Sequence, residues 1–515
     1  MKTLEAFTIG VVGTGAMGRG IAQLFAQSGH VVQLFDAAPG AAQAARAAVA
    51  DALGRQVDKG RLARDACDAT VDRLRPVETL AGLAGCDLVV EAIVEDLAVK
   101  KRLFAELEAL LAPEALLVSN TSSLSVTAIA AACRAPERVA GYHFFNPVPL
   151  MKVVEVIRGV RTAPGTVETL VALTRRTGHA PVLAQDTPGF LINHAGRGYG
   201  TEALKLVGEG VADVYAVDRI MREQVVFGGS GFRLGPFELL DLTGLDVSHP
   251  VMESIYRQFY EEPRFRPSVL AAQRAAGGLL GRKTGEGFYR HENGQQVTVP
   301  ETALPPQAGP SPFARVWVAP GPRREALCAL AVALGAALDD ASAPGADSLV
   351  LLAPLGLDAT AAALDAGVPA ERTIAIDTLF PFAAGACRRR VLMGTPATDP
   401  ALALAAQRLF SADGARTTLL RDSAGFVAQR IVAMVVAVAC EIAQQRIATP
   451  ADIDLAVRLG LGYPTGPLSM GDALGAATVS AVLDGMHAST ADPRYRPSLW
   501  LRRRAQLGLS LLHAD

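Results

Sequence analysis

Cysteine is scarce in this chain, and its residues form no recognisable motif. The six cysteines are scattered, with no C-x-x-C pair and no cluster with histidine: Cys67, Cys86, Cys133, Cys328, Cys387 and Cys440. This spacing argues against a zinc site or a disulfide framework and favours reduced, mostly buried thiols in a reducing compartment. We therefore expect a cytoplasmic protein without a metal site.

The chain also lacks an excess of either charge and a long apolar segment. Its 49 basic and 51 acidic residues give a net charge of -2, which offers no global basis for binding nucleic acid or an anionic membrane. The start MKTLEAFTIG lacks the apolar stretch of a signal peptide. The most apolar later run, residues 431–440, is too short to span a bilayer. We expect a soluble protein, and a local basic site for an anionic ligand is compatible with this balance.

The first part of the chain alternates between strand-like and helix-like patterns. The segment AMGRGIAQLFAQSG has helical spacing and lies between the apolar runs FTIGVVG and HVVQLFD. Further short apolar runs follow in CDLVVEAI, ALLVSN and RVAGYHFF. This alternation is typical of an α/β fold with a doubly wound parallel sheet. From about Asp186 to about Gly281 the pattern becomes helical, and a polar Gly/Pro-rich linker follows.

The second half of the chain repeats the first. PRFRPSVL at 263 recurs as PRYRPSLW at 493, an offset of 493 - 263 = 230, and DTPGFLINH at 186 recurs as DSAGFVAQR at 422, an offset of 422 - 186 = 236. LGPFELLD and PERVAGYHFFNP recur as TGPLSMGD and AERTIAIDTLFP. A duplication explains these matches. We predict five parts: a Rossmann-like domain (1–185), an all-α domain (186–290), a linker (291–315), a degenerate α/β domain (316–421) and a second helical domain (422–515).

The two copies differ at their polar positions. The segment VWVAPGP of the second copy has no G-x-G-x-x-G. Four further pairs differ: His143 and Asp377, Ser122 and about Gly356, Glu155 and about Arg389, Asn193 and Gln429. Our interpretation is that the second copy retains packing residues and lacks the polar ones, which predicts one active site in each chain.

The segment GVVGTGAMGRG contains Gly13-x-Gly15-x-x-Gly18 between a strand and a helix. The first glycine permits the tight turn, the second lets the backbone approach a pyrophosphate, and the third lets helix and strand pack closely. Asp36 follows at the end of the next strand, where a carboxylate accepts hydrogen bonds from ribose hydroxyls and repels a 2′-phosphate. The pattern predicts NAD as cofactor; the alternative for Asp36 is an aspartate in a surface turn.

AGYHFFNPVPLMKVVEV reads as two strands separated by a turn, with His143 and Glu155 in otherwise apolar sequence. The two side chains are either a buried structural pair or an acid/base couple. Histidine suits proton abstraction from a hydroxyl group, and a carboxylate beside it fixes its tautomer and stabilises the imidazolium. The polar run SNTSSLS follows another predicted strand, where ligands bind in such sheets. Ser125 of this run, or Thr127 just after it, can instead cap the next helix.

Together these motifs resemble L-3-hydroxyacyl-CoA dehydrogenases. The resemblance covers about residues 7–290 and is carried by GVVGTGAMGRGIA, DLVVEAIVED, SNTSSLS, GYHFFNPVPLMKVVEV, DTPGFLINH, LGPFELLDLTGLD and GRKTGEGFY. The duplicated layout resembles the long bacterial form of that family, which includes the 3-hydroxyadipyl-CoA and 3-hydroxybutyryl-CoA dehydrogenases of phenylacetate degradation.

The resemblance implies a reaction and a set of site residues. The reaction is reversible NAD-dependent oxidation of an L-3-hydroxyacyl-CoA, with His143 as general base and Glu155 as its partner. Ser122 and Asn193 would bind the substrate near the reacting carbon. On the nicotinamide side the resemblance adds Glu95, Lys100, Ser122, Asn146 and Lys283. It also implies that Lys59 contacts CoA, together with Ser122 and Asn146, although Ala52 replaces a serine that accompanies this lysine in some relatives.

Two other functions compete with this interpretation. One is a different β-hydroxyacid dehydrogenase, and the other is a non-catalytic, crystallin-like NAD-binding protein. The four retained polar residues Ser122, His143, Glu155 and Asn193 argue against the second. The acyl preference stays open, since His194 and Arg197 either meet a distal carboxylate or lie on a helix surface. We further expect the two helical domains to pack together as an intramolecular pseudo-dimer, with a homo-oligomer compatible with that packing.

Overall fold

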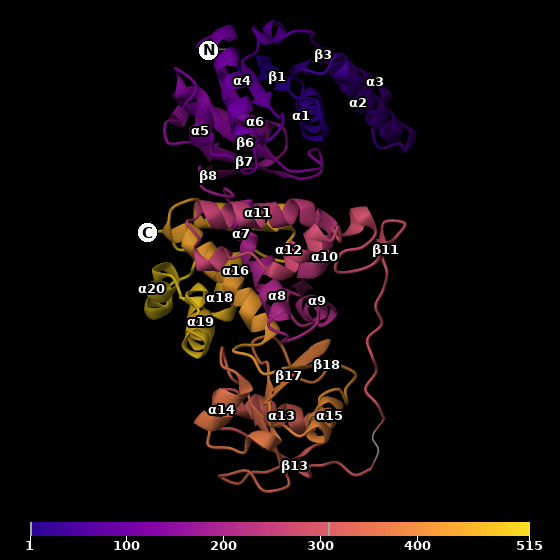
Figure 1. Ribbon diagram of the computed structural model, residues 1–515, viewed down its shortest axis with the longest axis vertical. Helices are drawn as coiled ribbons and strands as arrows, with labels where there is room; N and C mark the ends of the chain where they lie inside the picture. Colours follow the sequence, from indigo (N-terminus) through magenta and orange to yellow (C-terminus); the bar gives the residue numbers. More distant parts are fainter. Residues whose placement is uncertain (1–2, 307–308) are drawn as a thin grey trace. The chain divides into compact units, whose positions relative to one another are not determined.

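The computed structural model describes residues 3–306 and 309–515. Residues 1–2 of the predicted first domain and 307–308 of the predicted linker lie outside the described residues. The chain forms two compact units, of which unit 1 comprises Met1–His194 with Gln445–Leu461, and unit 2 comprises Ala195–Gln444 with Gly462–Asp515 (Figure 1). A segment of the second copy therefore belongs to the same unit as the first α/β domain.

Unit 1 is built on an eight-stranded sheet of order β3-β2-β1-β4-β5-β6-β7-β8. The neighbouring strands are parallel except for β6 and β7, which are antiparallel. The eight residues between β6 and β7 are too few for the crossover that a parallel pair needs. The strands are β1 (Thr8–Val12), β2 (Val31–Phe35), β3 (Leu74–Pro76), β4 (Leu88–Glu91), β5 (Leu116–Ser119), β6 (Val139–Phe144), β7 (Val153–Arg158) and β8 (Ala180–Gln185).

Apolar cores lie on both faces of this sheet, as a doubly wound fold requires. One core packs β1 and β2 against α1, and the other includes Phe104 and Leu107 of α4. Side-chain caps define where two of the helices begin: Asp96 accepts the N–H of Val99, and Ser125 accepts the N–H of Ala128. The helices are α1 (Ala16–Gln27), α2 (Ala41–Asp58), α3 (Arg64–Asp72), α4 (Leu97–Leu110), α5 (Val126–Ala130), α6 (Pro164–Arg176) and α17 (Pro450–Leu461), and α7 (Ile192–Ala195) spans the boundary with unit 2. The predicted doubly wound sheet is confirmed.

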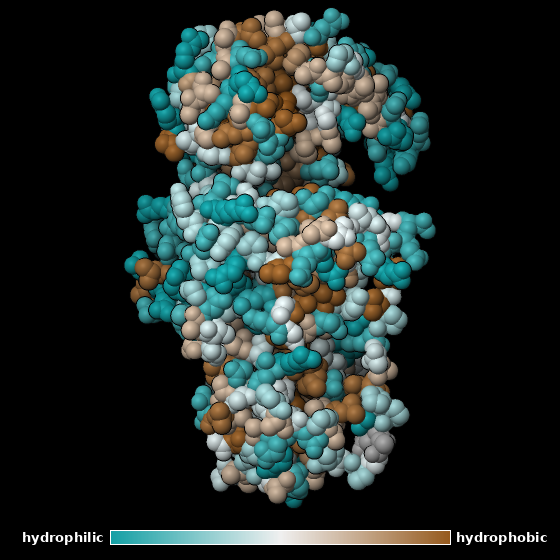
Figure 2. All heavy atoms as spheres, viewed as in Figure 1, coloured by the Kyte–Doolittle hydropathy of each residue, from teal (hydrophilic) through white to brown (hydrophobic). Residues whose placement is uncertain are grey.

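The helical part of unit 2 is organised around α16 (Val427–Gln444), which is buried along nearly its whole length. This helix is longer than the apolar run seen in the sequence, and by length and composition it could cross a membrane. Of its 18 residues, 89% are buried inside the protein, so α16 is a core helix of the fold. The other helices are α8 (Arg197–Gly208), α9 (Val214–Glu223), α10 (Pro236–Thr243), α11 (Leu245–Gln258), α12 (Val269–Ala276), α18 (Pro467–Leu474), α19 (Ala476–Thr490) and α20 (Leu499–Leu507). On the face drawn in Figure 2, hydrophilic and hydrophobic residues are interspersed.

Unit 2 also contains a six-stranded sheet of order β14-β13-β15-β16-β17-β18. It has two strands fewer than the first sheet and keeps the antiparallel step, here between β16 and β17. Its strands are β13 (Arg315–Val318), β14 (Ala337–Leu338), β15 (Ser348–Leu352), β16 (Thr373–Ile376), β17 (Arg389–Gly394) and β18 (Arg416–Leu420), and its helices are α13 (Arg324–Ala333), α14 (Ala359–Asp365) and α15 (Pro400–Leu409). Short hairpins complete the unit: β9 (Val226–Phe227) with β10 (Ser230–Gly231), and β11 (His291–Glu292) with β12 (Gln295–Gln296).

The second copy corrects two expectations. Its register places Val391 opposite Asp377, because the Asp377 N–H donates to the Val391 carbonyl; Arg389 is therefore not the counterpart of Glu155. The expected loss of polar residues is also wrong. Gln429 is fully buried, and its amide donates to Asp377 Oδ1 at 3.0 Å and accepts the N–H of Gly356. The copy has exchanged one buried polar network for another.

Candidate active site

The glycine turn between β1 and α1 has the shape of a dinucleotide cradle. Gly13 has φ +90°, and a Cβ there would lie 2.5 Å from the Ala92 carbonyl oxygen. A Cβ at Gly18 would lie 1.8 Å from the Gly13 oxygen, so this glycine is required by close packing. At Gly15 a Cβ would meet nothing within 4 Å. Gly15 caps α1 without a side chain, which leaves backbone N–H groups facing the open space where a pyrophosphate fits.

Asp36 lies at the end of β2 and is fixed by the same turn. Its Oδ2 accepts the Thr14 N–H at 2.7 Å and the Thr14 hydroxyl at 2.9 Å, and its Oδ1 accepts the Ala38 N–H at 3.0 Å. Burial opposes ionisation of Asp36, but the hydrogen bonds from Thr14 and Ala38 outweigh it and lower the pKa of this carboxyl. A fixed, ionised carboxylate at this position suits ribose hydroxyls and opposes a 2′-phosphate.

A buried charge network lies at the ends of β4 and β5. Glu91 is fully buried. Its carboxylate accepts hydrogen bonds from the Lys100 ammonium at 2.6 Å, the Ser119 hydroxyl at 2.6 Å and the Ile93 N–H at 2.7 Å. Lys100 is only 1% exposed, and its ammonium also lies 3.2 Å from Glu95. The predicted cofactor residue Lys100 is thus enclosed by two carboxylates.

Glu95 organises the polar loop after β5. Its Oε1 accepts the Thr121 hydroxyl at 2.6 Å, the Ser122 N–H at 3.1 Å, and the Ser123 N–H at 3.2 Å. Burial opposes ionisation of Glu95, but the hydrogen bond from Thr121 and the charge of Lys100 outweigh it and lower the pKa of its carboxyl. Glu95 therefore fixes the backbone from which the predicted site residue Ser122 projects.

His143 and Glu155 are directly opposite neighbours in the antiparallel pair β6–β7. The imidazole Nδ1 lies 2.5 Å from Glu155 Oε2, and the side chains are 6% and 0% exposed. An ionised carboxylate can only accept, so Nδ1 carries the proton in the neutral ring and Nε2 is left as acceptor. Among the described residues, Nε2 has no hydrogen-bond partner within the chain. The pair has the geometry of a supported general base.

The other Glu155 oxygen is held by backbone groups. Oε1 accepts the N–H groups of Leu191 at 2.9 Å and Ile192 at 2.7 Å. The residue before them, Phe190, has φ +49°, a left-handed conformation that costs a bulky residue about 1–2 kcal/mol. Such strain is found where the surroundings demand a specific geometry. Asn193 is the next residue, in α7, and it therefore directly follows the Ile192 N–H group that contacts Glu155.

The remaining predicted residues occupy varied positions. Asn146 and Lys59 are exposed, and Lys59 ends α2. Lys283 belongs to unit 2, where its ammonium lies 2.8 Å from Asp246. His194 is 1% exposed, so the alternative that it lies on a helix surface is wrong. Arg197 is partly buried, and burial lowers its pKa to about 10.

Three contributors to the site were missed in the sequence. Glu91 could have been found, because an acid ending the apolar strand DLVVE is unusual. The Leu191 and Ile192 N–H groups carry no side-chain signal. The packing of α17 on β7 and β8 has no local signal either, because α17 lies more than 250 residues further along the chain than these strands.

The site lies within a sequence that matches known families and structures. The family model "3-hydroxyacyl-CoA dehydrogenase, NAD binding domain" matches residues 8–187, and the C-terminal domain model of the same family matches both 189–291 and 425–510. A 3-hydroxyadipyl-CoA dehydrogenase of Escherichia coli K12 is 36% identical over 501 residues, covering 97% of this chain and 98% of the relative. The human mitochondrial hydroxyacyl-coenzyme A dehydrogenase is 40% identical over 289 residues, covering 55% of this chain and 90% of the relative.

A solved structure extends the likeness to the whole fold. The crystal structure of a 3-hydroxybutyryl-CoA dehydrogenase from Escherichia coli K12 aligns with a TM-score of 0.83 at 35% identity, covering 98% of each chain. The (S)-3-hydroxybutyryl-CoA dehydrogenase of Ralstonia eutropha aligns over 56% of this chain with a TM-score of 0.53. The first match spans both copies, and the second spans a length similar to that of one copy.

Proposed function

Because this chain belongs to the 3-hydroxyacyl-CoA dehydrogenase family and is an NAD-dependent oxidoreductase of 3-hydroxyacyl-CoA thioesters, we propose that His143 is its general base and Glu155 the supporting carboxylate. The observation that carries this proposal is the 2.5 Å contact between His143 Nδ1 and Glu155 Oε2. It leaves Nε2 as the atom that accepts the proton of the 3-hydroxyl group.

Each group of the pair has a defined task in the oxidation. NAD, when bound, accepts the hydride from C3 of the substrate. His143 Nε2 takes the hydroxyl proton, and Glu155 stabilises the imidazolium that forms. The Leu191 and Ile192 N–H groups donate to Glu155 Oε1 and fix the orientation of the carboxyl group. In the reverse direction the imidazolium returns the proton to the 3-oxo group.

The other predicted residues complete the proposed site. Ser122 and Asn193 bind the substrate around the reacting carbon, and the Gly13, Gly15 and Gly18 turn with Asp36 holds NAD. Glu95 shapes the nicotinamide side, and Lys100 acts through Glu95, because its ammonium is enclosed. Asn146 and Lys283 add to the cofactor and substrate contacts. Lys59 contacts CoA from the exposed end of α2.

Two acyl groups are favoured by the relatives, namely 3-hydroxyadipyl-CoA and 3-hydroxybutyryl-CoA. An adipyl tail ends in a carboxylate and needs a cation, for which Arg197 is the candidate. Comparing kcat/KM for the two thioesters tests the assignment. An unchanged preference in Arg197→Ala would remove that residue from consideration.

We also propose that the two helical domains form an intramolecular pseudo-dimer. In a two-fold interface equivalent residues make reciprocal contacts. Arg264 donates to the Arg494 carbonyl at 3.2 Å, while its repeat counterpart Arg494 donates to the Pro263 carbonyl at 3.3 Å. Gly198 meets Met434, its own counterpart (434 - 198 = 236), where a Cβ would lie 2.9 Å from the Met434 oxygen.

A chain ending near Gly281 tests the pseudo-dimer by light scattering. Such a chain should self-associate or aggregate through the uncovered face of α8, and a well-behaved monomer would contradict the proposal. We also propose the five-part domain division and a cytoplasmic location for this protein. The family matches end near residues 187 and 291 and resume near 425, which supports the domain division.

The reaction itself is tested by following NADH absorbance with acetoacetyl-CoA as oxidant. Turnover that requires NADH and the thioester supports the proposal. A chain that binds NADH without turnover would instead support the non-catalytic alternative.

A further inference from the structure

The end of helix α17 and the end of helix α9 occupy matching positions in the duplication. Residues 186–227 align with 422–463 without a gap, so Gln224 corresponds to Gly460 (460 - 224 = 236). The alignment is also structural: the Gln185 N–H donates to the Ile447 carbonyl, and its counterpart, the Arg421 N–H, donates to the Val211 carbonyl. Each half thus supplies a segment that packs against the sheet of the other half.

Gln224, at the end of α9 in the first copy, reaches the counterpart of the proposed base in the second copy. Its amide donates to Asp377 Oδ2 at 3.0 Å, while Gln429 donates to Asp377 Oδ1 at 3.0 Å. Asp377 and Gln429 correspond to His143 and Asn193. A side chain at position 224 therefore enters the volume beside the residue equivalent to His143.

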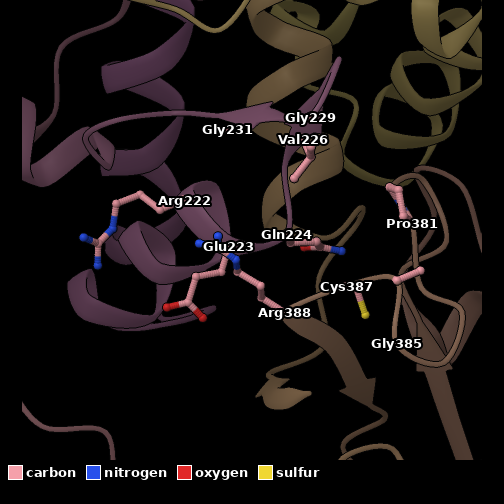
Figure 3. Close-up of a pocket in the computed structure, with 11 residues that line it drawn as sticks. Arg222, Glu223, Gln224, Val226, Gly229, Gly231, Pro381, Gly385, Cys387 and Arg388 are labelled. Atoms are coloured by element: carbon pink, nitrogen blue, oxygen red, sulfur yellow. The ribbon is translucent and has the colours of Figure 1, made fainter. Parts of the chain in front are cut away.

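The surroundings of Gln224 are drawn in Figure 3. Its side chain extends toward the loop that carries Pro381 and Cys387, whereas Arg222 and Glu223 point away from that loop (Figure 3). The loop, the end of α9 and the β9–β10 hairpin line an open pocket of about 290 Å³. Beside the second sheet, Gln224 therefore fills part of the space that adjoins Asp377.

Beside the first sheet, the matching position on α17 is a glycine. Gly460 packs on Ile192, where a Cβ would lie 2.6 Å from Ile192 Cδ1. The Ile192 N–H is one of the two backbone donors to Glu155, at 2.7 Å. Gly460 therefore lies one residue from the carboxylate that supports His143, and the Ile192 side chain occupies the place that a side chain at position 460 would take.

We propose that α17, from the degenerate half, completes the active site, and that Gly460 is a positioning residue. Its lack of a side chain lets Ile192 pack directly on α17, which seats the Ile192 N–H for the bond to Glu155. The inference rests on the proposed roles of His143 and Glu155. Failure of those roles would appear as turnover in His143→Ala, independently of any change at Gly460.

The direct test is Gly460→Gln, which introduces on α17 the amide that the first copy carries at the matching position, Gln224. We expect kcat/KM for acetoacetyl-CoA to fall by about 100-fold, because small displacements at a reacting centre have effects of that size, with NADH binding unchanged. Arg458→Gln places the same side chain on an exposed position of the same helix and should leave both values unchanged. A kcat/KM within about twofold of wild type in Gly460→Gln would overturn the proposal.

A second test separates positioning from general damage. Gly460→Ala should lower kcat by about tenfold without changing the KM for NADH, because the new Cβ presses on Ile192. Alanine is the better helix former, so weaker helix formation cannot account for this loss. The double variant Gly460→Ala/Ile192→Val removes the nearest atom, Cδ1, and should recover most of the rate. A loss that the second substitution does not relieve would overturn the role of Ile192.

Discussion

His143 and Glu155 face each other across two antiparallel strands, with 2.5 Å between Nδ1 and Oε2. The pairing fixes which ring nitrogen carries the proton before any ligand binds. Both side chains are almost fully buried, so an uncompensated charge on either one would be costly. Their relationship leads to the first prediction.

Replacing the base should remove most of the rate and leave cofactor binding intact. We expect His143→Ala to lower kcat by about 10²- to 10⁴-fold, the usual contribution of a general base, while the Kd for NADH stays at the wild-type value. Glu155→Gln should lower kcat as well, because a neutral amide stabilises an imidazolium less than a carboxylate does. Stopped-flow turnover with acetoacetyl-CoA and fluorescence titration with NADH give the two quantities.

The control for this prediction is His513→Ala, since His513 is exposed near the end of the chain. It should match the wild type in both measurements. Near-wild-type turnover in His143→Ala would exclude His143 as the base.

The buried Glu91–Lys100 pair is predicted to be needed for stability. Glu91→Gln leaves the enclosed Lys100 ammonium with Glu95 alone, and breaking a buried ion pair costs about 3–5 kcal/mol. The double variant Glu91→Gln/Lys100→Met removes the unpaired charge and should be less destabilised than the single variant. Urea unfolding measures both, and the exposed Glu106→Gln on the same helix should be neutral. Equal destabilisation of the single and double variants would contradict this account.

The sequence was sufficient to predict the sheet. For the site, it indicated those residues whose role depends on their side chains. Gly13 and Gly18 are needed because of close backbone packing, and a spacing rule detects that need. His143 and Glu155 were paired by their places on two expected strands. Where a backbone group acts, as at Ile192, the residue type carries no signal. The sequence also did not show that one polar residue can replace another in a new network. Gln429, at the position of Asn193, was interpreted as the loss of a site residue, although Gln429 forms a buried network with Asp377.

Long-range packing was the other part that the sequence could not supply. Helix α17 lies in the second copy, yet it packs on β7 and β8 of the first. The apolar face of α17 can pack on many apolar surfaces. No local sequence pattern shows which surface it covers, because that depends on the complete duplicated fold. The sequence places Gly460 only within the predicted second helical domain (422–515), and the fold alone brings this residue to Ile192.

A pH prediction concerns Asp218, which is buried in unit 2 and accepts the N–H groups of Phe237 and Glu238 and the hydroxyl of Tyr289. Burial raises its pKa to about 7, above an unfolded value of about 3.9. The folded state therefore binds this proton more tightly. Its contribution to stability is fully present below about pH 4 and is lost as the pH rises through about 7.

Urea unfolding at several pH values tests the role of Asp218. A single group of this kind contributes a slope of up to about 1.4 kcal/mol per pH unit within that window. Asp218→Asn cannot titrate, so its unfolding free energy should fall less steeply between about pH 5 and 7 than that of the wild type. Parallel pH dependence in the two proteins would show that Asp218 ionises normally in the fold.

The close packing of α8 against α16 yields the last prediction, which uses two glycines of one helix. A Cβ at Gly198 would lie 2.9 Å from three backbone atoms of Met434 and Val435, whereas a Cβ at Gly208 would meet nothing within 4 Å. Backbone cannot yield as a flexible side chain can, so Gly198→Ala should destabilise by about 1–3 kcal/mol through overpacking. Gly208→Ala should stabilise by up to about 1 kcal/mol, because alanine favours the helix. Opposite signs in urea unfolding would mark α8–α16 as a fixed interface, and equal effects of the two substitutions would refute it.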